Sequence, residues 1–139
     1  MASQILRDAR IEINSVVESA YGNQVSLDLA KEEQDDTAFG DQARPMLAGL
    51  ETPQFSAGIN QDFASGGIDG RLFALWSAGT PVTVKVRPSS AAIGASNPEY
   101  VGTFTPTQYS PFGNSVGDAA KASIRWPYGS GTGMARNVA

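Results

Sequence analysis

Apolar and polar residues alternate with a period of two in several short segments of this sequence, which are separated by Gly, Pro, Asn and Ser. In the clearest case, TPVTVKV, the residues Val82, Val84 and Val86 alternate with polar side chains. Such alternation is typical of strands with one buried face, and β-branched residues favour strands. The pattern predicts a mainly β fold, a β-sandwich or barrel of about six or more antiparallel strands. The segments are residues 10–13, 26–29, 54–60, 82–87, 100–105 and 120–126.

One segment, SGGIDGRLFALWSAG, has helical periodicity instead and predicts one flanking α-helix. Ser65 is a candidate N-cap, and Gly79 is well placed to end the helix. An isolated helix of about three turns is marginal in water, so we expect its apolar stripe to pack on a sheet, with Phe73 near the edge of the stripe. Its aromatic side chains are expected to belong to the core. The residues predicted to pack on the sheet are Ile68, Leu72, Leu75 and Trp76.

The chain has 139 residues and contains no cysteine and no histidine. Disulfides, thiolate metal sites and every Ser-His-Asp or Cys-His arrangement are therefore excluded. The length suits one domain that spans residues 1–139. Charged residues make up 17% of the chain, below the roughly 25% that is usual for soluble domains, which suggests that much surface is buried against partners. We predict no enzymatic activity and no cofactor.

Residues 30–50 form a long acidic connection without clear periodicity. Six of the fourteen carboxylates of the chain lie between Asp28 and Asp41. A structureless loop of this length in a compact domain is usually functional or disordered. We expect its apolar residues to be exposed, and these are Phe39, Met46 and Leu47.

Within this connection, the stretch DDTAFGD places three carboxylates around a phenylalanine and a glycine. A calcium loop would need oxygen ligands at alternate positions from Asp35, but Phe39 occupies one of them and Met46 is the twelfth residue. A divalent cation site at Asp35, Asp36 and Asp41 is a less favoured alternative. Adjacent acids on a polar loop form a solvated face more often than a catalytic pair.

Residues 127–139, PYGSGTGMARNVA, are predicted to form a flexible C-terminal tail because glycine is frequent in them. The glycine run from Gly129 to Gly133 lacks the lysine of a phosphate-binding loop and has no following helix. A nucleotide site is therefore not predicted here.

The net charge of −4 and the isoelectric point near 4.6 argue against a protein that grips nucleic acid, because gripping phosphates needs clustered cations. The basic residues are dispersed. Lys85 and Arg87 share the polar face of one predicted strand, and Arg125 could join them. We expect these residues to form a salt-bridged exterior.

The N-terminal residues MASQILRDARIEI carry charges before any apolar run, so no secretory signal is predicted. No window approaches eighteen apolar residues, and no membrane span is predicted either. The chain is expected to fold in a cytoplasm.

Three longer stretches, taken in order, closely resemble the major tail proteins of long, non-contractile-tailed bacteriophages, particularly those that infect actinobacteria. The matching features include the D-x-T-x-F-G-D element from Asp35 to Asp41, the Asn60-Gln61-Asp62 that follows a strand, and the helix followed by VTVKVRP. The resemblance covers about residues 9–127. The stretches are QDDTAFGDQARPMLAGLETPQFSAGINQDF, LFALWSAGTPVTVKVRPSSAAIGASNPEY and YSPFGNSVGDAAKASIRW.

This resemblance implies a tail tube protein fold and a structural virion protein, made and assembled in the host bacterial cytoplasm. Six copies would form a ring, and stacked rings would form a hollow tube through which DNA passes without specific binding. Its partners would be other copies of the chain, the tape measure protein, and the tail terminator and distal tail proteins. Residues 32–50 would be the loop that docks on the adjacent ring, with Phe39 as its apolar anchor. The docking residues implied are Asp35, Asp36, Thr37, Phe39, Gly40, Asp41, Arg44, Met46 and Leu47.

Six copies would carry a charge of −24, and a predominantly acidic lumen would repel DNA phosphates. Two alternatives stay open. A tail terminator or distal tail ring protein would share the fold but make only one ring. A monomeric ligand-binding β-sandwich is less favoured, because the tyrosines of the chain are scattered.

Overall fold

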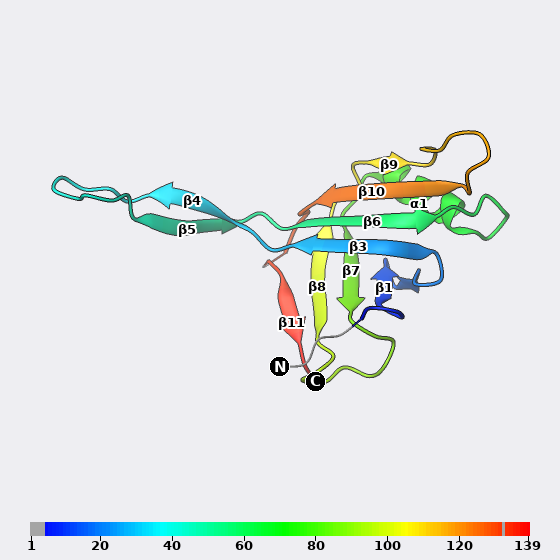
Figure 1. Ribbon diagram of the computed structural model, residues 1–139, viewed down its shortest axis with the longest axis horizontal. Coiled ribbons are helices and arrows are strands. Elements are labelled where there is room, and N and C mark those ends of the chain that lie inside the picture. Colours follow the sequence, from blue (N-terminus) through cyan, green and yellow to red (C-terminus); the bar gives the residue numbers. More distant parts are fainter. Residues whose placement is uncertain (1–4, 132) are drawn as a thin grey trace.

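The protein is described here by a computed structural model that covers residues 5–131 and 133–139. Residues 1–4 and 132, which belong to the N-terminal segment and to the predicted tail, lie outside the described residues. The described chain forms eleven strands and one helix (Figure 1). In chain order they are β1 (Arg10–Ile13), β2 (Val16–Val17), β3 (Gly22–Asp28), β4 (Lys31–Asp35), β5 (Met46–Glu51), β6 (Gln54–Asn60), α1 (Ile68–Ala78), β7 (Val82–Arg87), β8 (Glu99–Phe104), β9 (Tyr109–Ser110), β10 (Lys121–Pro127) and β11 (Ala135–Asn137).

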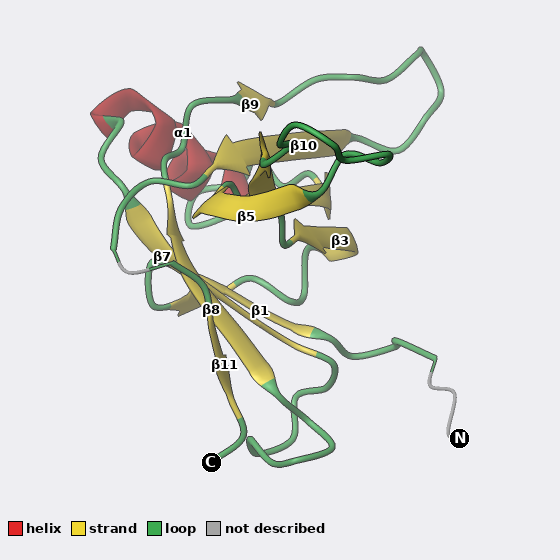
Figure 2. Ribbon diagram, turned by 90° about the vertical axis from the view of Figure 1, so that its left-hand side faces the viewer, coloured by secondary structure: helices red, strands yellow, loops and turns green. Residues whose placement is uncertain are grey.

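The strands form two main sheets in which every pairing is antiparallel. A five-stranded sheet has the order β11-β8-β7-β1-β2, and a four-stranded sheet has the order β3-β6-β10-β9. The strands of the two sheets cross one another, and β4 and β5 extend away from both as a separate two-stranded ribbon (Figures 1 and 2). The prediction of a mainly β fold with antiparallel strands and one helix is confirmed.

The core lies between the two sheets and is closed at one end by α1. Every second residue of β6 and β10 is buried, which follows from the alternation of the sequence. Phe55 of β6 lies 5.8 Å, between ring centroids, from both Phe104 of β8 and Trp126 of β10. These three rings are almost fully buried and join the two sheets. The buried apolar residues are Ile11, Ile13, Phe55, Ala57, Ile59, Ile68, Leu72, Val82, Val84, Phe104, Ala122, Ile124 and Trp126.

Helix α1 packs on the core through a narrow stripe. Ile68 and Leu72 are buried and Leu75 is partly buried, whereas Trp76 is 47% exposed. The expectation that Trp76 and Phe73 belong to the core is wrong, because α1 crosses the end of the sheets and only the stripe of Ile68, Leu72 and Leu75 faces them. Phe73 and Trp76 instead pack against each other on the outer side, with ring centroids 5.9 Å apart.

The ends of α1 differ in how well the sequence predicted them. The helix ends at Gly79, whose φ of 68° is left-handed and whose N–H donates to the carbonyl of Leu75, as predicted. Ser65 is not the N-cap: Gly67 occupies that position and provides no side-chain hydrogen bond. Gly67 fits there because a Cβ would lie 2.6 Å from the carbonyl oxygen of Asp62.

Two polar contacts fix the helix to neighbouring elements. Arg71 donates from Nε to Glu18 at 2.7 Å and from Nη2 at 3.1 Å, and this paired carboxylate raises the pKa of Arg71. The hydroxyl of Tyr109 in β9 donates to Asp69 at 2.6 Å and accepts a hydrogen bond from Gln61 at 2.8 Å. Burial and the bond to Asp69 raise the pKa of Tyr109 to about 12.

We expect the Tyr109 contact to make stability fall at high pH. A folded-state pKa of about 12 against an ordinary 10.0 means that this contribution is present below pH 10 and is lost as the pH rises towards 12. Urea unfolding at several pH values should therefore show a steeper loss of stability in this window for the wild type than for Tyr109→Phe. Equal slopes for the two proteins would contradict this role of Tyr109.

Arg87 and Glu99 form a buried ion pair between β7 and β8. Their side chains are 11% and 7% exposed, and Nε of Arg87 lies 3.2 Å from Oε2 of Glu99, although this contact lacks hydrogen-bond alignment. Nη1 of Arg87 donates to the carbonyl of Ala91 at 2.8 Å. The predicted salt-bridged exterior is therefore wrong for Arg87. Arg125 does not join it either, because it lies on β10 in the other sheet.

The C-terminal segment is not the flexible tail that its glycines predicted. Residues of β11 pair with β8, and the backbone N–H of Met134 donates to Glu51 at 3.2 Å. The side chain of Met134 packs over Gly102, where a Cβ would overlap its sulfur and would lie 2.9 Å from Cε2 of Phe104. The absence of a side chain at position 102 is what lets the C-terminal segment lie against the sheet.

We expect Gly102→Ala to displace Met134 and to detach β11. Overpacking of this kind costs about 1–3 kcal/mol of unfolding free energy. Urea denaturation would measure the loss, and amide hydrogen exchange at residues 135–137 would show whether β11 is released. Gly94→Ala is the matched control, because a Cβ there meets no atom within 4 Å. Unchanged exchange at residues 135–137 in Gly102→Ala would contradict the packing argument.

Candidate assembly surface

The ribbon of residues 31–51, which we call the arm, is a continuation of the β3–β6 pair (Figure 1). Asp28 lies opposite Gln54 and Lys31 lies opposite Glu51, so the register is the same on both sides of the junction. The N–H of Thr52 donates to the carbonyl of Ala30 at 2.8 Å and bridges the gap. The expectation of a structureless loop is wrong, because the long β3–β6 hairpin already aligns the two chains that pair in the arm.

The arm packs against neither main sheet along most of its length. All five residues of β4 are exposed, and so are five of the six residues of β5. The side chains of β4 are charged or polar, whereas β5 exposes Met46 (49%), Leu47 (55%) and Leu50 (76%). A lone two-stranded ribbon is marginally stable in water, and an exposed apolar edge strand favours pairing with another chain.

The DDTAFGD tip of the arm is held by its own carboxylates. Asp35 accepts hydrogen bonds from the backbone N–H of Thr37 at 2.8 Å and from the Thr37 hydroxyl, which lowers the pKa of Asp35. Asp41 accepts from the N–H of Ala38 at 2.7 Å. Gly40 has a φ of 91°, a left-handed conformation that other residues rarely adopt. The tip is therefore a defined turn.

This turn presents Phe39 to solvent. The side chain of Phe39 is 108% exposed relative to its reference state, so it contributes nothing to the core. The resemblance implied that Asp36 and Asp41 are both partners for donors on another copy, but the carboxylate of Asp41 is used inside the tip. Asp36 donates through its N–H to the carbonyl of Pro45, and its carboxylate has no hydrogen bond within residues 5–131 and 133–139. Asp36 is therefore the acid available for an outside partner.

The ion pair between Arg44 and Asp35 spans 3.7 Å, and the two side chains are 80% and 49% exposed. Exposed pairs of this kind contribute little to stability, so Arg44 is also accessible to another chain.

The negative charge of the chain is concentrated in the arm. Residues 31–51 contain six carboxylates and two cations, a net charge of −4, which equals the net charge of the whole protein. The rest of the chain is therefore balanced. The expectation of an acidic lumen rests on the net charge of the whole chain, and the excess of carboxylates lies in the arm.

The end of the molecule opposite the arm carries a second apolar feature (Figure 1). Phe63, between β6 and α1, stacks on Phe112, between β9 and β10, with ring centroids 5.2 Å apart and planes 23° apart. Phe63 is 49% exposed and Phe112 is 76% exposed. Sequence reasoning missed this pair because both residues lie in connections without periodicity and are 49 positions apart in the chain.

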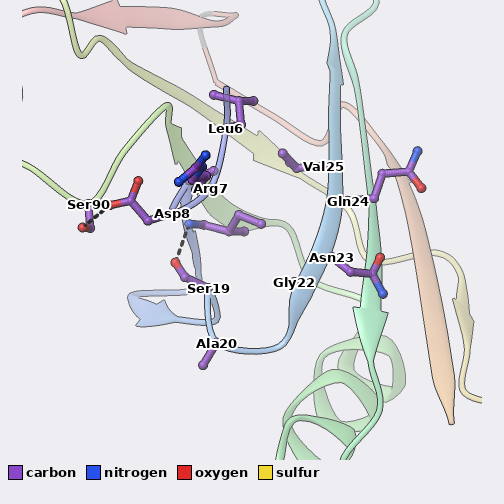
Figure 3. A pocket seen from close by; sticks show the side chains of 12 residues that line it. Leu6, Arg7, Asp8, Ser19, Ala20, Gly22, Asn23, Gln24, Val25 and Ser90 are labelled. Atoms are coloured by element: carbon purple, nitrogen blue, oxygen red, sulfur yellow. Dashed lines mark hydrogen bonds between the residues drawn. The ribbon is translucent and has the colours of Figure 1, made fainter. Parts of the chain in front are cut away.

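A cavity of about 530 Å³ lies between β3 and the segment that leads into β1 (Figure 3). Ser90 donates to Asp8 at 2.9 Å, and Ser19 accepts from the backbone N–H of Ile11 at 2.9 Å. Asp8 is the only carboxylate among its lining residues, so the cavity does not bring together a pair of acids.

The described residues also bear on the less favoured metal site and on membrane spans. Among them, no group of three or more acidic side chains is close enough to hold a metal ion, so Asp35, Asp36 and Asp41 do not form a divalent site. None of the described helices is both long and apolar enough to cross a membrane.

The overall fold is shared with chains of known phage-like tails. A chain in the virion of a native gene transfer agent particle superposes with a TM-score of 0.76 and 16% identity over 97% of this chain and 99% of that one. A chain in the tail of the empty gene transfer agent particle, which has C6 symmetry, superposes with a TM-score of 0.74 and 17% identity over 99% of both chains. The SPP1 tail tube protein superposes with a TM-score of 0.71 and 10% identity over 95% of this chain and 77% of that one.

No protein-family model and no curated protein matches this sequence. The class that the structure defines is therefore the tail tube protein fold, and the fold that the sequence resemblance implied is confirmed. At identities of 10–17%, the likeness concerns the fold.

Proposed function

We propose that this protein is the subunit of a tail tube, in which six copies close into a ring and rings stack into a hollow conduit for DNA. The observation that carries the proposal is the arm: a ribbon whose two strands are exposed at nearly every residue, with Phe39 fully exposed at its tip, on a fold shared with tail tube proteins. The activity is polymerisation followed by passive conduction, without a catalytic step.

Ring closure would cover the free edges of the two sheets. The four-stranded sheet ends at β3, which is seven residues long, and at the short β9. A long unpaired edge is a hazard for a protein that stays monomeric, because it offers a row of free hydrogen-bonding groups to any other chain. A heterologous contact between copies that closes into a ring covers these edges and removes the hazard. A second heterologous contact that propagates along the ring axis stacks the rings into a tube.

The outer face of the four-stranded sheet suits the lumen. It consists mainly of amide and hydroxyl side chains, with Asp28, Lys121 and Arg125 as its charged residues, and Arg125 donates to Gln54 at 2.9 Å. Such a surface holds phosphates weakly, because affinity for DNA grows with each phosphate that a cation neutralises. DNA could therefore slide along it without specific binding. The small polar residues that form this face are Gln24, Ser26, Gln54, Ser56 and Ser123.

The arm would make the contact between successive rings. Its apolar strand and its exposed tip supply surface that gains stability only when another copy covers it. The residues assigned to this contact are Asp35, Asp36, Thr37, Phe39, Gly40, Asp41, Arg44, Met46 and Leu47. Asp35, Gly40 and Asp41 act by shaping the tip, whereas Phe39 and Asp36 meet the partner.

In this role the protein would be assembled in the host bacterial cytoplasm and would remain in the virion. The tape measure protein would fill the lumen before ejection, and the tail terminator and distal tail proteins would cover the two ends of the tube.

Negative-stain electron microscopy of the purified protein over a range of concentrations tests this function. We expect long tubes with sixfold cross-sections above a critical concentration. Discrete rings that never stack would instead assign a tail terminator or distal tail role. Material that stays monomeric at high concentration would rule out both.

A further inference from the structure

Two exposed apolar features lie at opposite ends of the long axis of the described chain: the arm tip at one end, and at the other the connections that carry the Phe63–Phe112 pair (Figure 1). Two different surfaces at opposite ends can join copies head to tail, and a contact of this kind propagates along an axis, as a stack of rings requires. We infer that the arm tip of one copy docks beside Phe112 of a copy in the adjacent ring. This inference rests on the proposed function, since it names the receiving site for the arm.

A cleft beside Phe112 has the size that Phe39 requires. Its volume is about 160 Å³. An apolar cavity of about 150 Å³ is enough to hold benzene, so a phenyl ring fits in a cleft of this size. Phe63 stacks on Phe112 and holds that ring in place at the rim. The lining residues are Ser110, Phe112, Gly113, Lys121, Ala122 and Ser123.

The charges match as well as the shapes. Lys121 is the only charged residue that lines the cleft, and within the described parts of the chain it forms no ion pair. On the arm tip, the carboxylate of Asp36 lies three residues before Phe39 and is not used inside the turn. With Phe39 seated in the cleft, Asp36 can pair with Lys121.

The acids nearest the receiving end are already engaged. Asp62 accepts hydrogen bonds from the N–H of Ala64 at 3.0 Å and from Tyr21, and Asp118 accepts from the N–H of Ser115 at 3.4 Å. These bonds hold the connections on which Phe63 and Phe112 lie.

A second exposed aromatic pair, Phe73 and Trp76 on α1, is the competing receptor for the arm. The cleft that α1 lines, about 190 Å³, includes neither of these two rings, and its cation is Arg71, whose guanidinium is already paired with Glu18. An incoming carboxylate would therefore find its cation occupied. The Phe112 cleft offers both an aromatic ring and a cation that forms no ion pair among the described residues.

A charge exchange tests the docking site. We expect Asp36→Lys and Lys121→Glu each to raise the critical concentration for tubes at least ~10-fold, because each places like charges in contact. The double variant, in which the charges are exchanged, should return to within about threefold of the wild type. Glu33→Lys combined with Lys121→Glu is the matched control and should show no recovery. A double exchange that is no better than its single variants overturns the inference.

Cross-linking gives an independent measurement, because the chain has no native cysteine. Ala38→Cys places a thiol beside Phe39, and Gly113→Cys places one in the cleft, where a Cβ meets no atom within 4 Å. Oxidation of tubes that carry both changes should produce a ladder of covalent multimers. In the comparison variant, Ser77→Cys on α1 replaces Gly113→Cys.

The outcomes test the docking site and the proposed tail tube function separately. A ladder with Gly113→Cys and none with Ser77→Cys supports the Phe112 cleft. Tubes that cross-link only through Ser77→Cys overturn the cleft while the tail tube function stands. A wild-type protein that makes no tubes overturns the proposed function and this inference with it.

Discussion

Replacing Phe39 and Asp41 together by alanine should abolish tube formation and leave a folded, soluble monomer. Phe39 is fully exposed in the monomer, so its removal costs no folding stability. Burying a phenylalanine in an interface gains about 1.5–3 kcal/mol. Loss of Asp41 frees the N–H of Ala38 and lets the tip fluctuate, so that docking must also order it. Each 1.4 kcal/mol changes an equilibrium tenfold, so the critical concentration should rise on the order of 100-fold.

Sedimentation and negative-stain microscopy would measure the loss of tubes, and circular dichroism would establish that the fold is intact. Phe73→Ala is the matched control, because it removes a phenyl ring that is also exposed from α1 rather than from the arm. It should polymerise like the wild type. Tubes of normal length from the double variant would show that the arm does not make the assembly contact.

Glu99→Ala should lower the free energy of unfolding by about 3–5 kcal/mol, because it leaves the buried guanidinium of Arg87 without its counter-ion. Both side chains lie between strands β7 and β8 at 11% and 7% exposure, where water cannot replace the carboxylate. The bond from Nη1 to the carbonyl of Ala91 remains but does not neutralise the charge. Urea denaturation monitored by tryptophan fluorescence would report the change, since Trp126 is buried in the same core.

The double variant Arg87→Met with Glu99→Leu is the control for this result. It removes both charges and keeps the volume, and such replacements are often neutral or stabilising. We expect its stability to lie within about 1–2 kcal/mol of the wild type. A loss below about 1 kcal/mol in Glu99→Ala would mean that water reaches Arg87 and that the pair is not buried in solution.

Sequence reasoning predicted the strands whose alternation is strong and local. Residues 54–60, 82–87 and 120–126 correspond to β6, β7 and β10, and their inward residues form most of the core. Each of these strands has one face in the core, so every second residue is apolar and the sequence shows the burial pattern directly.

The elements that were missed depend on partners far away in the chain. KEEQD in β4 has no alternation, and it becomes a strand because β3 and β6 bring β5 alongside it. The glycine-rich end forms β11 because β8 offers a free edge and Gly102 leaves room for Met134. Periodicity within a short window carries no information about such pairings.

The same limit applies to individual side chains. The position of Arg87 in the alternation of β7 predicts an exposed side chain. The side chain is buried instead, where it pairs with Glu99 of the next strand. Trp76 has the spacing of a core residue, but α1 crosses the end of the sheets and leaves it half exposed. In both cases the environment is set by a segment that lies elsewhere in the sequence.

By itself, the sequence determined the class of fold, the position of the helix and the exposure of Phe39, because local periodicity, glycine placement and a polar surrounding act within a few residues. Only the tertiary structure decided that residues 31–51 form a paired arm, that the acidic excess projects with it, and that Phe63 meets Phe112 at the opposite end. The physical reason is that strand pairing and packing join residues that are distant along the chain. Their free energy therefore depends on the assembled fold and not on any one segment.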